Sequence, residues 1–171
     1  VMFAQGKTLI ELLVTLSLVT ILSATAVPQL SQFIHEYRLR SAADSLYHAL
    51  YAARYEATVR QQRISLRNIH GDWRGELEMF VDGNGSGERE DGEEVLRSLP
   101  LSHGGLVISG NSNISHYVSY MPDGRALTAS GAFQAGTFRL CQPGHQGLYR
   151  IVLSIGGRLR RDHQAGSSCD N

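Results

Sequence analysis

Hydrophobic positions run almost without interruption near the start of the chain. Between Leu9 and Val27 the only charged residue is Glu11. About 20 predominantly apolar residues are what a helix needs to cross a bilayer. A carboxylate at membrane depth is costly, so Glu11 is expected to have both a purpose and a partner. The pattern therefore predicts a membrane-spanning helix in this part of the chain.

After Pro28 the apolar residues continue at helical spacing, and most charged residues fall on the other faces. The apolar positions are Phe33, Ile34, Leu39, Ala42, Ala43, Leu46, Ala49, Leu50, Ala53 and Ala57. This spacing predicts a second, amphipathic half of the same helix, which ends near Gln61 and packs its apolar stripe against a sheet.

Beyond Arg63 the apolar residues gather in short runs that glycine, asparagine, aspartate, serine and proline separate, as is typical of strands and turns. The runs are Ile64–Ile69, Glu76–Val81, Val95–Leu99, Leu106–Ser109, His116–Met121, Thr137–Cys141 and Tyr149–Ile155. A long helix followed by strands indicates an α+β fold, with the helix on an antiparallel sheet or sandwich.

The 171 residues suit one globular domain and one membrane helix. We expect a leader over residues 1–6, an apolar helix over 7–30 and a globular domain over 31–171. Within that domain the prediction is an amphipathic helix over 31–61 and a β-rich part over 63–171.

The first residues, Gly6-Lys7-Thr8-Leu9-Ile10-Glu11, resemble the type III signal of type IV pilins and pseudopilins. The resemblance implies that a prepilin peptidase cuts after Gly6, that the new amine on Lys7 is methylated, and that Glu11 aligns each subunit with its neighbour during assembly. Lys7 departs from the family, which usually has phenylalanine there. An ordinary signal peptide or signal anchor is the alternative, and Ser23–Ala26 could imitate its cleavage site.

Segments further along resemble the minor pilins of the GspH, FimT and FimU type. They are Trp73, Phe80–Gly85, Gly92–Leu96, Met121–Arg125 and Gly136–Cys141. The resemblance implies a pilin-like fold, a single-pass placement in the bacterial inner membrane before assembly, and then a pilus on the cell surface with the globular domain in the periplasm or outside the cell.

The two cysteines, Cys141 and Cys169, are expected to form a disulfide, because a domain behind such an anchor lies in an oxidising periplasm. The bond would close a loop of about 28 residues and stabilise by about 3–4 kcal/mol in the chain-entropy model. Two free thiols are the alternative.

The net charge of zero hides an asymmetry, since acidic residues concentrate between 72 and 94 and arginines follow from 95 onward. All but one of the sixteen basic residues are arginines, which contact phosphate in a planar, bidentate way that lysine cannot. A GC-rich genome would produce the same bias.

Near the end of the chain, Gly156-Gly157-Arg158-Leu159-Arg160-Arg161 is the first candidate site. In a strand, Arg158 and Arg160 would project from one face about 6–7 Å apart, which suits neighbouring phosphates. Leu159 would face inward and Arg161 the other side. The stretch resembles the C-terminal G-R-x-R motif of FimT-type minor pilins, which bind DNA during natural transformation.

By that resemblance, Arg158 and Arg160 after Gly157 contact double-stranded DNA. The sequence indicates no ordered base-reading element, which suggests contact without sequence preference. Other basic residues could extend the patch: Arg139, Arg150, Arg161 and His163. The alternative is a solvated edge strand that charge protects against edge-to-edge pairing.

The second candidate is a loop in which Asp82, Asn84, Ser86 and Glu93 stand near the positions of calcium ligands in an EF-hand. Helices should flank such a loop, whereas the pattern here predicts strands. An acidic hairpin connection is therefore the favoured interpretation, and no metal is expected.

The sequence shows no catalytic constellation, because the histidines lack metal-ligand spacing and no phosphate-binding loop is present. We expect no enzyme and no cofactor. The predicted function is a minor pilin that binds extracellular DNA for uptake, with other pilin subunits as its further partners. The alternatives are a structural minor pilin or a GspH-type pseudopilin of type II secretion without DNA binding, and more distantly a membrane-anchored calcium-binding module.

Overall fold

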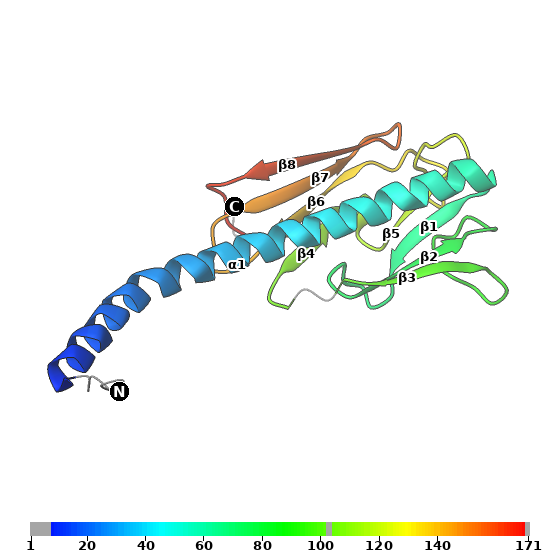
Figure 1. Cartoon of the computed structure of the whole chain (residues 1–171). Helices are drawn as coiled ribbons and strands as arrows, with labels where there is room; N and C mark the ends of the chain where they lie inside the picture. The colour runs from blue at the N-terminus through cyan, green and yellow to red at the C-terminus, as the bar shows by residue number, and fades with distance from the viewer. Residues whose placement is uncertain (1–7, 102–103, 170–171) are drawn as a thin grey trace. The chain divides into compact units, whose positions relative to one another are not determined.

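A computed structural model describes residues 8–101 and 104–169, without the side chains of Pro28 and Ser112. One long helix precedes a series of short strands (Figure 1). The elements in chain order are α1 (Leu9–Arg60), β1 (Ile64–Asn68), β2 (Glu76–Val81), β3 (Val95–Pro100), β4 (Val107–Gly110), the 3-10 helix η1 (Ser112–Ile114), β5 (Tyr117–Tyr120), β6 (Gly136–Cys141), β7 (Leu148–Leu153) and β8 (Leu159–Gln164).

Helix α1 continues through Pro28, as the spacing of apolar residues predicts. It ends at Arg60, one residue before Gln61, whose φ of 53° is in the left-handed region that commonly terminates helices. The chain forms two compact units, residues 1–37 and 38–171, and α1 contributes to both.

In the first unit, the large apolar side chains of α1 are exposed from Leu9 to Ile34. An 18-residue window of this helix has a mean hydropathy of 2.1 and none of it is buried. By length and composition, α1 is a candidate membrane span. Such a span would cover these side chains with lipid.

In the second unit, the apolar stripe of α1 packs into a single core. The buried helix residues are Leu39, Ala42, Ala43, Leu46, Ala49, Leu50, Ala53 and Ala57. Small alanines let the backbones approach closely, and Trp73 and Phe138 from the β-rich part meet edge-to-face with ring centroids 4.8 Å apart. The predicted contact between helix and sheet is therefore confirmed.

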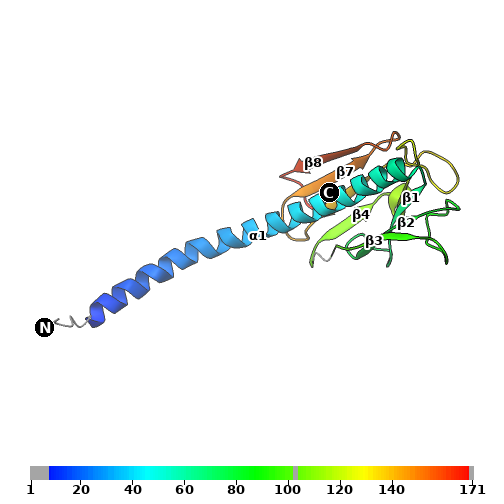
Figure 2. The ribbon, with the colours of Figure 1, turned by 45° about the vertical axis from the view of Figure 1, so that its right-hand side comes forward.

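The strands form two four-stranded antiparallel sheets, in the orders β3-β2-β1-β5 and β4-β6-β7-β8. Figure 2 shows α1 running across strands of both sheets within the second unit. The α+β prediction is confirmed, and each of the seven predicted apolar runs coincides with a strand to within two residues. Strand β8 was not among those runs, because its sequence LRRDHQ is mostly polar.

Candidate nucleic-acid interface

A tight turn joins β7 to β8 and carries the start of the arginine stretch. Leu153 and Leu159 are paired on either side of it. The Gly157 amide donates to the Ser154 carbonyl at 2.8 Å, and the Ser154 amide donates to the Arg158 carbonyl at 2.9 Å. The Arg158 amide also donates to the Ser154 hydroxyl at 3.1 Å. The backbone that presents Arg158 is thus held by local hydrogen bonds.

A second turn and α1 fasten this hairpin. Gly157 has a φ of 72°, and a Cβ added there would lie 2.0 Å from the carbonyl oxygen of Gly124. Arg54, on α1, donates from Nε to that carbonyl at 3.0 Å and from Nη2 to the carbonyl of Gly156 at 3.4 Å. Only glycine allows both this backbone conformation and this close approach. Sequence reasoning missed Arg54, since nothing local marks it as different from other helix arginines.

Alternation along β8 separates the arginines between two faces. Leu159 and Arg161 are paired with buried residues, Leu153 and Ile151, on the face toward α1. Arg160 is paired with Val152 on the opposite face, and Arg158 precedes it by two residues. Arg158 and Arg160 are both exposed, and neither guanidinium forms an ion pair or a hydrogen bond with the described residues. Arg158 directly precedes β8, so the expected placement of these two side chains on one face stays a prediction.

Arg161 does not extend that patch. Its guanidinium is ion-paired with Asp44 of α1 and lies 6.0 Å from the ring centroid of Tyr47. His163 also belongs to the face toward α1, where its ring stacks on Tyr149 with centroids 4.4 Å apart. Arg161 and His163 therefore lie outside the patch expected around Arg158 and Arg160, because alternate residues of a strand point to opposite faces.

Two further arginines do lie on the face of Arg160. Arg139 on β6 is directly opposite Arg150 on β7, which in turn is opposite Asp162 on β8. The Arg150 Nη2 donates to Asp162 Oδ2 at 2.8 Å. This hydrogen bond is the main reason that the pKa of Asp162 is lowered, and the charges of Arg150 and Arg160 add to the effect. The sequence reveals neither pairing, because both depend on the strand register.

The disulfide lies at the other end of the same sheet. Cys141 and Cys169 are bonded, 28 residues apart in sequence, so the predicted pairing is confirmed. The Gly147 amide donates to the Ser167 carbonyl at 2.8 Å. The C-terminal segment is thereby held against the start of β7 and the end of β6.

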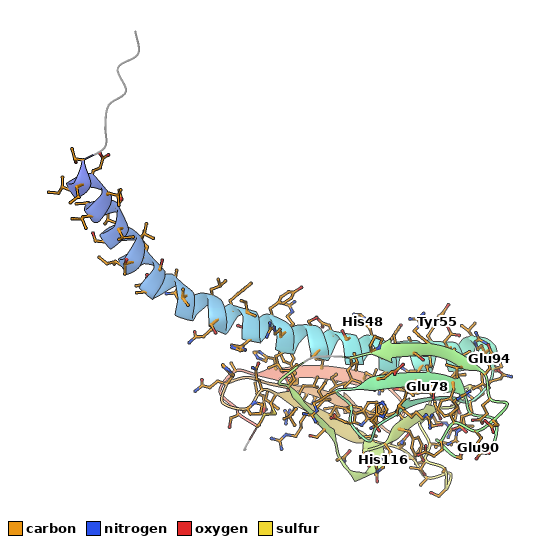
Figure 3. All side chains as sticks on the ribbon, turned by 90° about the horizontal axis from the view of Figure 1, so that it is seen from below. His48, Tyr55, Glu78, Glu90, Glu94 and His116 are labelled. Carbon is orange, nitrogen blue, oxygen red and sulfur yellow. A yellow bond between two sulfur atoms is a disulfide. The ribbon has the colours of Figure 1, made fainter. Side chains whose placement is uncertain are left out.

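The acidic loop between β2 and β3 uses its oxygens to hold its own backbone. Asp82 is buried, and its Oδ2 accepts from the Ser65 hydroxyl at 2.6 Å and from the Gly87 amide at 3.0 Å. Glu93 accepts from the amides of Gly83 and Glu90, both at 2.9 Å. Strands flank the loop, as expected, and Glu90 and Glu94 are labelled on it in Figure 3. Among the described residues, no group of three potential metal ligands gathers here.

The pilin signal lies mostly outside the described residues, which exclude Gly6 and Lys7. Glu11 is in the first turn of α1, where its amide donates to the Thr8 hydroxyl at 3.4 Å. Cleavage, methylation and the assembly role of Glu11 stay predictions.

A long helix whose apolar side chains are exposed from Leu9 to Ile34 and buried against two antiparallel sheets further on is a pilin-like architecture, and comparison with known families agrees. The sequence profile of the family described as "Type II transport protein GspH" matches residues 42–157. The chain belongs to this family. No curated protein matches the sequence significantly.

Solved structures show the same fold. The type IV minor pilin FimU of Pseudomonas aeruginosa PAO1 is 25% identical, with a TM-score of 0.65, over 80% of this chain and 98% of the FimU chain. A second crystal form of FimU gives 24% identity, a TM-score of 0.58, and coverage of 76% and 98%. The minor pseudopilin EpsH of the type 2 secretion system of Vibrio cholerae is 14% identical, with a TM-score of 0.52, over 73% and 96%. At such identity EpsH shows a shared fold alone. The chain is therefore a minor pilin or pseudopilin.

Proposed function

We propose that this protein is a minor pilin of a type IV pilus and that it binds extracellular double-stranded DNA, without sequence preference, for uptake in natural transformation. The observation that carries the proposal is the pair Arg158 and Arg160. Arg158 directly precedes β8, Arg160 is the second residue of β8, and both are exposed on a hairpin that Arg54 and Gly157 hold in place. Neither guanidinium forms an ion pair with a carboxylate of the described residues, and two such neighbouring guanidiniums suit adjacent phosphates.

The proposal places the chain in the inner membrane before assembly. Prepilin peptidase would cut after Gly6, the amine of Lys7 would be methylated, and Glu11 would align the subunit with its neighbours in the fibre. The resemblance of the first residues to the pilin signal and the exposed apolar part of α1 support this placement. No group in the described part of the chain suggests catalysis, so the proposed role is binding and assembly.

A binding titration tests the DNA role. The full chain in a nonionic detergent is titrated into fluorescently labelled 30-base-pair duplexes (roughly three helical turns) of several sequences, at several salt concentrations. Arg158→Gln/Arg160→Gln should weaken binding to all duplexes alike and reduce the slope of log K against log salt by about 0.9 for each phosphate that the variant no longer neutralises. The matched control is Arg38→Gln/Arg97→Gln, which removes the same charge from exposed positions elsewhere. Equal effects of the two double variants would reject the assignment.

A structural subunit without DNA binding is the second candidate function, as a minor pilin or as a pseudopilin of type II secretion. The family profile, described by its type II transport member, favours it. In that case the parent chain would bind duplexes no more tightly than the Arg158→Gln/Arg160→Gln variant. Deleting the gene would then impair pilus assembly or secretion but leave DNA capture by the remaining pili unchanged.

A further inference from the structure

The face of β6, β7 and β8 that points away from α1 has an unusual charge arrangement. Arg139 and Arg150 are directly opposite each other on neighbouring strands. Like charges at directly opposite positions of a sheet destabilise it. The only carboxylate among the described residues that forms an ion pair with either of them is Asp162, which pairs with Arg150. Arg139 has no ion pair or hydrogen bond within the described chain.

Arg150 is itself incompletely satisfied. Its Nη2 binds Asp162, but its Nε is buried and has no hydrogen-bond partner among the described residues. Buried donors are normally paired, so Asp162 leaves part of the hydrogen-bonding capacity of Arg150 unused. The Asp162 side chain is 44% exposed, and its pair with Arg150 is only partly shielded from water. Such a pair contributes little to stability, so a competing anion can replace it.

A carboxylate and a phosphate offer a guanidinium the same recognition chemistry, which is two oxygens in one plane that accept parallel N–H donors. Asp162 thus occupies the position on Arg150 that a phosphate would use. Arg160 is two residues before Asp162 on the same face of β8, so the phosphate-binding face would continue without a break from Arg160 to Arg150.

Resting on the function proposed above, we propose that the DNA-binding surface extends from Arg158 and Arg160 across β8 and β7 to Arg139, and that Asp162 competes with DNA phosphate for Arg150. Strands lie about 4.8 Å apart, so this surface is about 10 Å wide from β8 to β6. Four arginines against one aspartate over that width suit a polyanion rather than a single phosphate group.

Removing the competitor should strengthen binding. The full chain in nonionic detergent is titrated with the same labelled duplexes. Asp162→Asn should tighten binding by about twofold to fivefold, the range of one exposed ion pair, and should increase the salt slope by about 0.9 as Arg150 becomes free for phosphate. Asp91→Asn is the matched control, because it removes one exposed negative charge from the distant β2–β3 loop. An equal gain in both variants would overturn the competition.

Removing the far arginine should weaken binding. Arg139→Gln should reduce the salt slope by about 0.9, whereas Arg97→Gln, which removes an exposed arginine from β3 of the other sheet, should leave it nearly unchanged. Arg150→Gln in the Asp162→Asn background should cancel the gain from Asp162→Asn. Thermal unfolding of each variant, followed by circular dichroism, establishes that the fold is intact.

The outcomes separate this inference from the function on which it rests. If Arg158→Gln/Arg160→Gln abolishes binding while Arg139→Gln behaves like Arg97→Gln, the DNA-binding role stands and the extended surface is rejected. If the parent chain binds no duplex at low salt, both are rejected.

Discussion

At the scale of single residues, a buried polar group without a hydrogen-bond partner is unfavourable for the stability of the core. Tyr120, at the end of β5, is fully buried, and its hydroxyl has no hydrogen-bond partner among the described residues. Burial raises the pKa of the Tyr120 hydroxyl, since the phenolate would have to form away from water. Ionisation of Tyr120 therefore disfavours the folded state relative to the unfolded one.

The sign of the resulting pH dependence follows from this shift. Below the ordinary tyrosine pKa of about 10 both folded and unfolded chains hold the proton, and the free energy of unfolding is not reduced by ionisation of Tyr120. As pH rises further the unfolded chain loses its proton first, so the free energy of unfolding falls until the folded-state pKa is passed. We expect Tyr120→Phe to show a smaller loss of stability between about pH 9 and pH 11 in urea unfolding.

Tyr51→Phe is the control for this prediction, because Tyr51 is exposed on α1. A steep alkaline loss that persists in Tyr120→Phe would show that other groups cause it. At neutral pH, Tyr120→Phe should be neutral or slightly stabilising, since it removes a buried hydroxyl that lacks a partner.

Gly157 allows the opposite kind of test, in which a side chain is added. Gly157→Ala should destabilise by at least about 1–2 kcal/mol from the left-handed conformation alone, and the close approach to the Gly124 carbonyl adds to this. It should also weaken DNA binding, because the turn that presents Arg158 must shift. Gly156→Ala is the matched control, since no atom lies within 4 Å of its added Cβ; a comparable loss there would contradict the packing argument.

At the scale of elements, β8 depends on its neighbours more than on its own sequence. It is the edge strand of its sheet and has one strand partner, β7. Three attachments hold the β7–β8 hairpin and the segment after it: the Arg54 hydrogen bonds at the turn, the ion pair between Arg161 and Asp44, and the disulfide. A mostly polar strand is stable here because each end is tied to another element.

The disulfide is the strongest of these attachments. Replacing Cys141 and Cys169 with serine should lower the free energy of unfolding by about 3–4 kcal/mol, because the open chain gains loop entropy. Urea unfolding with and without a reducing agent measures the effect. The reductant should lower the stability of the parent chain to that of the double variant, and a reductant-sensitive double variant would contradict this assignment.

At the scale of the whole molecule, the two units differ in how their apolar side chains are buried. Every core residue from Leu39 onward lies in the second unit, whereas the apolar side chains of the first unit are exposed. The exposed apolar side chains of the first unit therefore need a covering of lipid or of other subunits.

Deletion of residues 1–30 tests this division. We expect the shortened chain to be soluble without detergent and to unfold cooperatively, with a Tm within a few degrees of the full chain in detergent, since the described side chains that it loses are all exposed. Differential scanning calorimetry measures both. A broad transition, or a Tm lower by more than about 10 °C (roughly 2–3 kcal/mol at this size), would show that the first residues contribute to the core.

Elements with a strong hydrophobic period could be predicted from the sequence alone, for a physical reason. Side chains on one buried face recur every 3.6 residues in a helix and every two residues in a strand. This recurrence of apolar residues can be read from the sequence without the structure. Two cysteines allow only one intramolecular disulfide. Alternation also predicts that Arg158 and Arg160 share a face once a strand is assumed.

The tertiary structure decided what lies across from what. The polar strand β8 is defined by its pairing with β7. Three contacts of the hairpin likewise join residues that are not neighbours in sequence: Arg161 with Asp44, Arg150 with Asp162, and Arg54 with Gly156. Such contacts depend on strand register and on how α1 lies over the sheets, and no local pattern encodes either one. The chemistry of the arginine face is therefore a property of the packed molecule, whereas the elements that build it are a property of the chain.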